Sequence, residues 1–249
     1  MRRTGWKGPD FPDPRDYKYT AHPQRYTGEL PREVDLPETP VTDQGDVNCC
    51  VFKALTSLME NAHFDIYLSA LWLYYEYRLR YGNICLDDGA YIRAAIKLAA
   101  EIGTPHESLW PYDNGQKWAE TPPDLAEAAG KNRVKDYWSI EGPDNNATVN
   151  NILSRLAQPG GNGVIFGMPV YESFEQIDRT GLVPYPNLKA EKMVGGHCMK
   201  AMGYKWGGEL IKVKNSWGVE WGQDGYCFMP VEMVMDFWSD IWTVDTLEG

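Results

Sequence analysis

The chain has 249 residues, of which 43% are hydrophobic and 13% aromatic, and its formal net charge is −11. This length suits one large domain or two small ones that share an interface, and the composition excludes a disordered chain. Without a block of Lys or Arg, neither nucleic acid nor an anionic membrane is expected as a partner, and no apolar run approaches the ~18 residues of a membrane span.

Residues 1–35 predict an extended arm. The stretch is rich in Pro, Asp, Arg and Tyr and has no periodicity. Four prolines interrupt it, at Pro12, Pro14, Pro23 and Pro31. We expect this arm to pack across the body as a strap, and an arm tied to the surface without a regulatory role is the equal alternative.

Helical patterns follow the arm. Apolar residues fall on one face from Cys50 to about Phe64, and Lys53, Ser57 and Glu60 fall on the other. Ser69 is a good N-cap for a second helix through "ALWLYYEYRLR". A third helix starts near Ala90 and stops at Gly103, and "NNATVNNILSRLAQ" predicts a fourth, shorter one.

After residue 160 the pattern becomes strand-like. "GVIFGM", "HCMKAMGYKW", "ELIKVKN" and "GYCFMP" are short, apolar and bounded by glycines. Helices followed by strands predict an α+β fold. We therefore expect an arm at 1–35, a mainly helical subdomain at 36–135 and a mainly β subdomain at 136–249, with a site in the cleft between the subdomains.

Two adjacent cysteines, Cys49 and Cys50, stand where a polar loop gives way to the first helix. A thiol at a helix N-terminus has a lowered pKa, because the dipole and free N–H groups favour the thiolate. Taken alone, the pair is more typical of small buried hydrophobic residues. Zinc would need spaced pairs such as C-x-x-C, so we expect no metal and no cofactor.

A nucleophilic cysteine needs a base and a residue that orients the base. Among the four histidines, His197 stands out, because two glycines precede it and a strand follows it. Asn215 ends a later strand, and its carbonyl could accept the histidine N–H, while Trp217 could shield that bond from water. Each residue alone also has a structural explanation. His22, His63 and His106 lie in the arm, on the polar side of the first helix and in a loop.

Together these segments resemble papain-like cysteine proteases. "DQG" with a cysteine six residues after the Gln resembles the family's Q-G-x-C-G-S-C-W segment, "GGHCMKAMGY" its histidine strand, and "IKVKNSWGVEWGQDGY" its N-S-W-G-x-x-W-G-x-x-G-Y segment. Other stretches, including "DDGAYIRAAIKLAAEIGTPHESLWPYD", "TGLVPYP" and "SDIWTV", resemble bacterial members. The likeness covers nearly the whole chain.

The resemblance implies a papain-like fold, with a helical left subdomain and a β-barrel-like right subdomain. It makes Cys50 the nucleophile, His197 the base, Asn215 the orienting residue and Trp217 its shield, with Cys50 and His197 resting as thiolate and imidazolium. It makes Gln44 the donor to the oxyanion, beside the Cys50 N–H.

The same resemblance suggests where a substrate binds. The substrate wall on the non-prime side, which holds the residues before the scissile bond, would include Asp88, Gly89 and Tyr91. Gly195 and Gly196 would form the opposite wall, and an extended peptide would bind between them like an added strand. The expected partner is therefore a polypeptide substrate, bound by a monomer.

The sequence also departs from the family pattern. Asn48-Cys49 replaces the usual Gly-Ser before the nucleophile, and we expect Asn48 to adopt the glycine's positive φ. Val51 replaces an aromatic residue, and Val47 replaces a disulfide cysteine. With no export signal, the five cysteines indicate reduced thiols and a cytoplasmic location. Cys49 is either inert packing, which we favour because adjacent cysteines form strained disulfides, or a resolving thiol.

Three functions remain open. The first is a cysteine endopeptidase with a Cys-His-Asn triad and an acyl-enzyme intermediate. The second keeps the triad but acts as a deamidase, transamidase or ligase. The third is a catalytically silent, peptide-binding module. Because every catalytic residue type is present, the endopeptidase is the favoured hypothesis.

Overall fold

The computed structural model describes residues 3–60, 67–82, 84–113 and 117–246. The helices are Cys50–Glu60 (α1), Ala70–Tyr81 (α2), Ile92–Ile102 (α3), Ala126–Ala129 (α4), Asn145–Ala157 (α5), Glu172–Glu175 (α6) and Val231–Phe237 (α7). The strands are Val34–Asp35 (β1), Val134–Ser139 (β2), Val164–Tyr171 (β3), Met193–Lys205 (β4), Leu210–Lys214 (β5), Tyr226–Pro230 (β6) and Ser239–Thr246 (β7). Short 3-10 helices cover Tyr19–Ala21, Glu107–Leu109, Lys117–Ala119 and Trp206–Gly208.

One antiparallel sheet forms the β half of the molecule. Its strand order is β2-β7-β3-β4-β5-β6, and β1 pairs with the far part of β4. The fold class is therefore α+β, as the sequence predicts, but the expected barrel-like closure is wrong, because β2 and β6 end the order without pairing to each other. The long strand β4 pairs with β3 over Met193–Ala201 and with β5 over Lys200–Lys205, which places His197 in mid-sheet.

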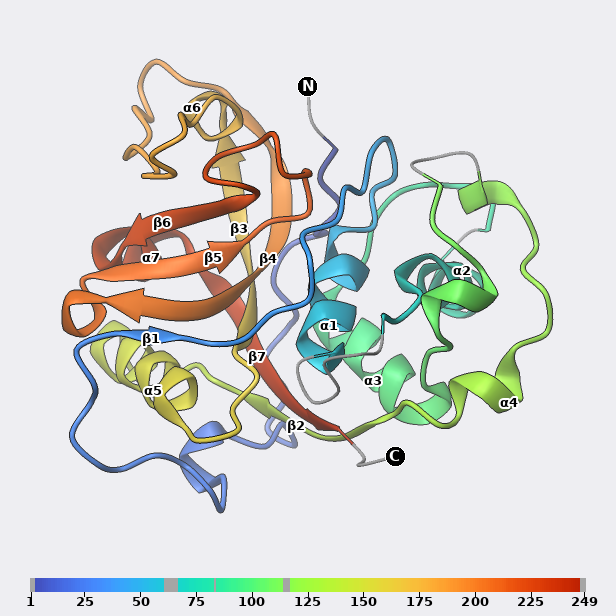
Figure 1. The fold of residues 1–249 in the computed structure, drawn as a ribbon, viewed down its shortest axis with the longest axis horizontal. Coiled ribbons are helices and arrows are strands. Elements are labelled where there is room, and N and C mark those ends of the chain that lie inside the picture. Colours follow the sequence, from blue (N-terminus) through green and yellow to red (C-terminus); the bar gives the residue numbers. More distant parts are fainter. Residues whose placement is uncertain (1–2, 61–66, 83, 114–116, 247–249) are drawn as a thin grey trace.

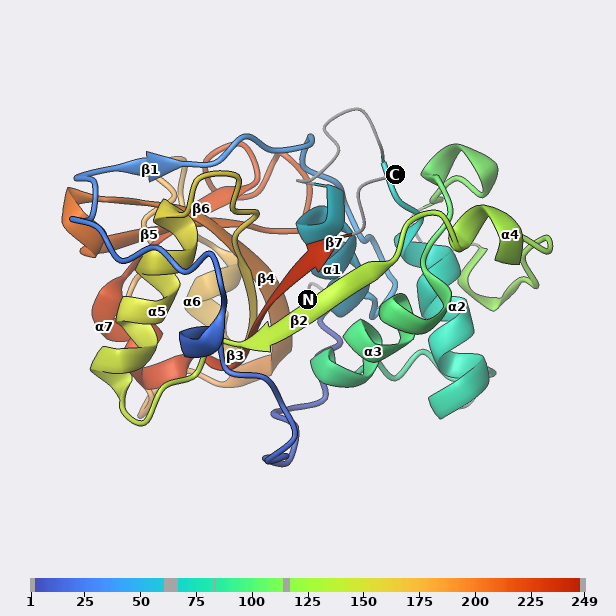
Figure 2. The same ribbon diagram turned by 90° about the horizontal axis from the view of Figure 1, so that it is seen from below.

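Helix α1 lies between the sheet and the other helices (Figure 1). It packs on β4 on one side and on α2 and α3 on the other, while α5 and α7 lie on the outer side of the sheet. In the view from below, β2 and β7 extend from the sheet toward α3 (Figure 2). One apolar core lies around α1–α3 and a second lies around the sheet and α5. The division into segments 1–35, 36–135 and 136–249 stays a prediction.

The predicted helices are confirmed where the structure describes them. The Ser69 hydroxyl caps α2 by accepting a hydrogen bond from Trp72 N at 3.3 Å. Helix α3 stops at Gly103, whose φ of 76° suits glycine. Helix α5 has 13 residues and is not the short helix expected. The predicted end of the first helix and His63 lie outside the described residues.

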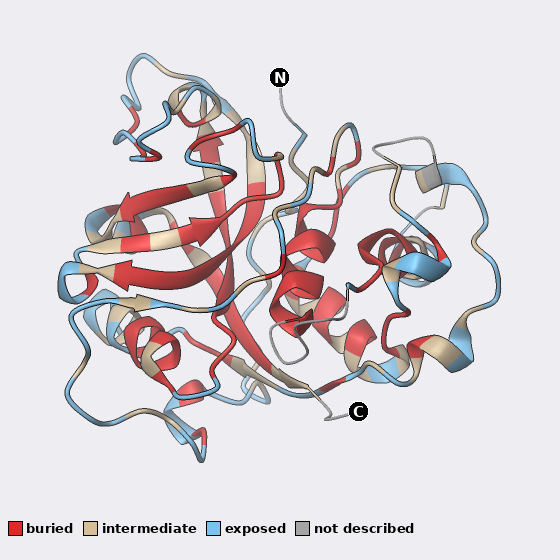
Figure 3. Cartoon of the chain, viewed as in Figure 1, coloured by how far each residue is buried: buried red, intermediate tan, exposed pale blue. Residues whose placement is uncertain are grey.

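Helix α1 is buried on all its faces, which the sequence does not predict (Figure 3). Lys53, Ser57 and Glu60 stand on the face expected to meet solvent, yet each is less than 10% exposed. Their side chains face a polar pocket between α1 and strands β4 and β5. A polar helix face can be buried when other polar groups cover it, and here those groups come from remote segments.

The arm follows an extended path across both halves. Arg93 of α3 holds Asp16 at 2.6 Å on the helical side. Tyr19 is fully buried, and its hydroxyl donates to Gln158 Oε1 at 3.0 Å beyond α5. Among the described residues, no helix is long and apolar enough to cross a membrane.

Candidate active site

The two adjacent cysteines point to different halves of the molecule. Cys50 is the first residue of α1, and its Sγ accepts a hydrogen bond from Cys198 N of β4 at 3.4 Å. Cys49 Sγ lies 3.2 Å from Tyr112 Oη on the helical side. Both are fully buried, and none of the five cysteines forms a disulfide within the described residues. Only Cys50 therefore faces the strand that carries His197.

His197 and Asn215 form a completed pair on the sheet. Strand β4 carries His197, and Asn215 follows β5, which pairs with β4. His197 Nε2 lies 2.7 Å from Asn215 Oδ1. The same oxygen also accepts Ser216 N at 2.7 Å, which orients the amide. The Trp217 ring stacks on the imidazole with centroids 4.6 Å apart.

The other imidazole nitrogen, His197 Nδ1, is buried and has no hydrogen-bond partner among the described residues. Because Nε2 is engaged with the Asn215 carbonyl, Nε2 is the atom that carries the proton in the neutral ring. Nδ1 is then an acceptor without a donor. A buried acceptor left unpaired is costly, so this nitrogen would gain from a hydrogen-bond donor brought to it.

Gln44 is fully buried. Its Oε1 accepts the Ser216 hydroxyl at 2.7 Å, which fixes the side-chain amide so that Nε2 points the other way. Nε2 donates to Val47 O at 2.8 Å and to Thr4 O at 3.3 Å. The Thr4 carbonyl of the arm therefore binds the Gln44 Nε2–H, the donor that the resemblance assigns to the oxyanion.

The N-terminal arm passes between the two predicted substrate walls. The amides of Gly5 and Trp6 both donate to Gly196 O at 3.0 Å on one wall. On the other wall, Ala90 N donates to Gly5 O at 2.7 Å. Any side chain at Gly89 would overlap the Gly5 backbone. Gly89 and Gly196 leave room for an extended chain between the walls, and in this structure that chain is the N-terminal arm.

The remaining predicted wall residues also contact the arm. Lys7 N donates to Ala90 O at 3.0 Å, and its ammonium lies 2.8 Å from Asp88 Oδ2. The same ammonium lies 6.0 Å from the centroid of the half-exposed Tyr91 ring. A side chain at Gly195 would overlap Thr4. The five predicted wall residues therefore all lie against residues 4–7 of the arm.

Asn48 does not replace a glycine in the way the sequence suggests. It is not among the described non-glycine residues with positive φ, so that expectation is wrong. Its amide nitrogen donates to Asp87 O at 2.6 Å, and its backbone N–H donates to the Asp87 carboxylate. The close approach is made by the arm instead, because a side chain at Gly5 would overlap Asn48 O.

Burial keeps the nucleophile and base neutral in this arrangement. It raises the pKa of Cys50 to about 12, although the N–H groups of Cys198, Val51 and Trp6 lower it. Burial also lowers the pKa of His197 to about 4, although Asn215 opposes this shift. Both shifts follow from the cost of placing a charge away from water. With the arm in place, the expected thiolate–imidazolium pair is not the favoured state.

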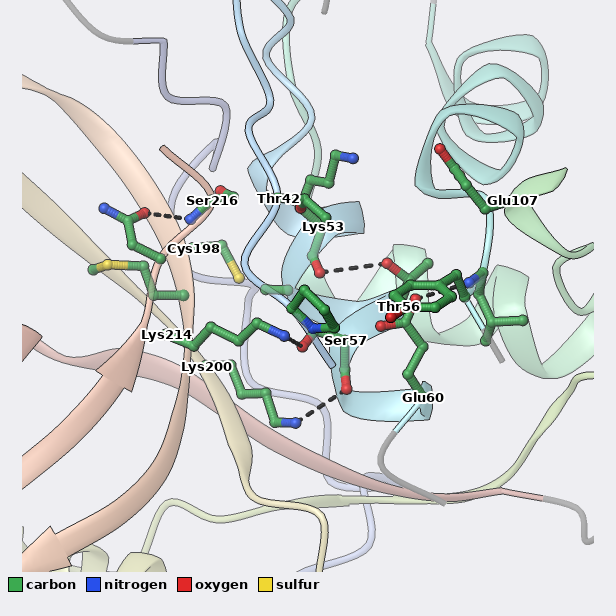
Figure 4. A pocket seen from close by; sticks show the side chains of 16 residues that line it. Thr42, Lys53, Thr56, Ser57, Glu60, Glu107, Cys198, Lys200, Lys214 and Ser216 are labelled. Carbon is green, nitrogen blue, oxygen red and sulfur yellow. Dashed lines mark hydrogen bonds between the residues drawn. The ribbon is translucent and has the colours of Figure 1, made fainter. Parts of the chain in front are cut away.

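A polar pocket lies behind the catalytic centre, between α1 and the strands β4 and β5 (Figure 4). Glu38 binds two buried ammonium groups there, Lys200 at 2.5 Å and Lys214 at 3.1 Å. Both lysines also reach helix α1, because Lys200 Nζ donates to Ser57 O at 3.0 Å and Lys214 Nζ to Ser57 Oγ at 2.9 Å. We call these four residues the Glu38 cluster, and they tie the sheet to the helical half.

Sequence reasoning missed two residues of the cleft. Trp6 belongs to the arm, and its indole enters the cleft wall beside Gly167. Asp240 of β7 accepts the Trp6 Nε1–H at 3.2 Å. The segment that contains Asp240 resembles the family, but one acidic residue in a strand carries no signal of a site. Among the described residues, no group of three or more His, Cys, Asp or Glu side chains could hold a metal ion.

Comparison with known families supports the arrangement. The profile of the papain family of cysteine proteases matches residues 30–235. An uncharacterized peptidase C1-like protein of Acanthamoeba polyphaga mimivirus is 29% identical over 247 residues, covering 92% of this chain and 79% of its own. Papain of Carica papaya is 27% identical over 211 residues, covering 79% of this chain, and this chain spans only 54% of papain's length.

Solved structures share the fold. Xylellain, a cysteine protease from Xylella fastidiosa, superposes with a TM-score of 0.84 at 27% identity, covering 100% of this chain and 98% of that one. A cysteine protease of Carica candamarcensis in complex with E-64 superposes with a TM-score of 0.63 at 20% identity, covering 86% and 98%. At that lower identity, the second match shows the fold alone.

Proposed function

Because this chain belongs to the papain family of cysteine proteases, we propose that it is a cysteine endopeptidase that works through Cys50, His197 and Asn215. The observation that carries the proposal is the completed His197–Asn215 pair, with Nε2 and Oδ1 2.7 Å apart, on the strand that faces the Cys50 thiol. A nucleophilic thiol needs a positioned base, and His197 Nδ1 is an acceptor without a partner among the described residues, one residue from the Cys198 N–H that contacts the Cys50 thiol.

The reaction transfers an acyl group in two stages. His197 Nδ1 takes the Cys50 proton, and the thiolate attacks the peptide carbonyl carbon. Gln44 Nε2 and the Cys50 N–H donate to the oxyanion that forms. His197 then gives its proton to the departing amine, which leaves a thioester on Cys50. Water, deprotonated by His197, attacks the thioester and releases the acid and the free thiol.

A substrate can bind only where the arm now lies. The arm enters at Trp217, whose indole N–H donates to Arg3 O at 3.0 Å, and it leaves at Asp88 with Lys7. If Asp88 marks the non-prime side, a substrate runs the other way, from Asp88 toward Trp217. The arm thus runs through the cleft in the direction opposite to a substrate, so none of its peptide bonds is oriented for attack. We propose that turnover requires this segment to leave the cleft.

Product mass tests the proposal. Full-length protein and its Trp6→Ala variant are incubated with an unstructured polypeptide, and products are analysed by mass spectrometry. We expect internal cleavage with one water added per cut, absent in Cys50→Ala. A one-unit mass change or amine incorporation without cleavage would favour a deamidase, transamidase or ligase instead. No product, with Cys50 unreactive toward iodoacetamide in both forms, would favour a silent binding module.

A further inference from the structure

The side chain of Trp6 fills a pocket in the cleft wall. Its backbone is held between Gly196 and Ala90, and its indole lies over Gly167 of β3. Any side chain at Gly167 would overlap the six-membered ring of the indole, and one at Gly196 would press on its edge. Gly167 stands opposite Cys198 and Ser239 in the sheet. Two glycines therefore make room for one large, flat side chain.

The base of this pocket is a carboxylate. Asp240 Oδ2 accepts Trp6 Nε1–H at 3.2 Å, and Oδ1 accepts Trp242 Nε1–H at 2.7 Å. Asp240 is only 5% exposed, and its φ of 54° places it in the left-handed region. Its own N–H donates to Glu141 Oε1 at 2.8 Å. The side chain is thus built into the pocket by bonds on both oxygens.

The carboxylate has neutral donors but no cation. Among the described residues, no Lys, Arg or His forms an ion pair with Asp240. Burial raises its pKa to about 7, and the negative charges of Asp10 and Glu141 add to this, although both indole N–H groups oppose it. A buried carboxylate without a counter-charge is costly, so a cation delivered to this place would bind with a large gain.

The position of the pocket identifies the substrate residue that would enter it. Gly5 lies against Asn48, two residues before the nucleophile, and Trp6 is the next arm residue toward Asp88. A substrate that runs in the opposite direction passes the same wall. Its second residue on the N-terminal side of the scissile bond then stands where Trp6 stands.

We propose that Asp240 is the specificity-determining residue of this cleft and that it selects a basic side chain, arginine foremost, at that second substrate position. This inference rests on the proposed peptidase function. The guanidinium is planar, like the indole it replaces, and it offers several N–H donors and a full positive charge to the carboxylate. Tryptophan is the second choice, because it repeats the bond that Trp6 makes.

The test compares substrates that differ in one charge. Full-length Trp6→Ala protein is assayed with fluorogenic peptides whose second residue before the leaving group is arginine, citrulline, tryptophan or leucine. Citrulline keeps the shape of arginine without its charge. We expect kcat/KM to be about tenfold or more higher for arginine than for citrulline, the usual scale of a desolvated charge pair. In Trp6→Ala/Asp240→Asn this ratio should fall to about 1.

Two controls accompany the assay. Trp6→Ala/Asp35→Asn removes an exposed carboxylate that binds Lys212 outside the predicted substrate walls, so its arginine-to-citrulline ratio should stay close to that of Trp6→Ala. Asn tolerates positive φ, so the fold should survive at position 240, and circular dichroism checks this. The arginine and citrulline comparison within one protein remains decisive even if Asp240→Asn does not fold.

Peptide binding separates this inference from the proposed function. The same peptides are titrated into full-length Trp6→Ala/Cys50→Ala protein, and Kd is measured. Tighter binding of arginine than of citrulline, without turnover by the intact thiol, would keep the Asp240 assignment and refute the peptidase. Equal Kd values, equal kcat/KM values, or a ratio that Asp240→Asn leaves unchanged would overturn the assignment.

Discussion

The two sides of the cleft are prepared to different degrees. On the sheet side, His197 is fixed by Asn215 and covered by Trp217, and both bonds lie within the fold. On the helix side, the groups that should act on a substrate are engaged elsewhere. Gln44 Nε2 donates in part to the arm carbonyl of Thr4, and the Cys50 thiol is fully buried, with the Trp6 N–H of the arm acting on it.

If Cys50 and His197 act as proposed, the fold alone positions the base, whereas the nucleophile becomes available only when the arm leaves. The His197–Asn215 bond joins two residues of the sheet side and involves no arm residue. The thiol and the oxyanion donor can act only after the arm carbonyl and the Trp6 amide have moved away. The predictions below test this contrast, from the largest expected effect to the smallest.

The strongest test compares the two cysteines. Cys50→Ala should lower kcat by at least ~10³-fold, because the attacking atom is lost. Cys49→Ala is the matched control. Cys49 faces Tyr112 and not His197, so its loss should change kcat by no more than about threefold, the scale of a small packing change. Peptide hydrolysis assays measure both, and a reversed order would assign the nucleophile to Cys49.

The sheet side is tested at Asn215. Asn215→Ala leaves the imidazole without its 2.7 Å partner, and kcat should fall about a hundredfold, at the low end of general acid–base contributions. KM should hardly change, because Asn215 does not line the walls that hold the arm. The pH profile of kcat should also move, since the amide favours the protonated ring. A rise in KM at constant kcat would contradict a positioning role.

The arm is tested by Trp6→Ala. Removing the indole takes away its bond to Asp240 and its packing on Gly167, so the arm should leave the cleft more often and kcat/KM should rise about tenfold. Phe11→Ala is the control, because Phe11 is an arm residue that is 90% exposed. Equal rates in wild type, Trp6→Ala and Phe11→Ala would show that the arm does not limit turnover.

The smallest effect is expected in thiol titration. With the arm in place, burial raises the pKa of Cys50 to about 12, so iodoacetamide labelling should be slow at pH 7 and rise with pH. In Trp6→Ala the thiolate regains water more often, and the midpoint of the labelling curve should move down by roughly one pH unit or less. Labelling mapped by mass spectrometry measures this shift, and an upward shift would refute it.

Local patterns predicted the helices well, because helix starts and stops depend on adjacent residues, whereas the roles of the site residues stay a prediction. The cap at Ser69, the stop at Gly103 and the motif around Cys50 each depend on a few neighbours. Strand β2 was not predicted, since "VKDYWS" has no clean alternation of buried and exposed residues. Its place is decided by pairing with β7, about a hundred residues later.

Features that depend on distant segments could not be predicted. Lys53 and Glu60 look like surface residues of a helix, and only the fold shows that the Tyr112 ring lies under Lys53 and that Thr39 and the Leu68 N–H bind Glu60. The position of Trp6 likewise depends on segments far from it in the sequence. The arm has no periodicity, and its path follows from the free N–H and C=O groups of Ala90 and Gly196.

The Glu38 cluster has a consequence for how the enzyme would open. One carboxylate joins Lys200 and Lys214 of the sheet, and both lysines hold Ser57 of the helical half. Separating the halves would strand buried charges, at a cost of about 3–5 kcal/mol for each broken pair. The Glu38 cluster should therefore hold the sheet and the helical half at a fixed separation. We expect that a substrate can enter once the arm has left, without any separation of the two halves.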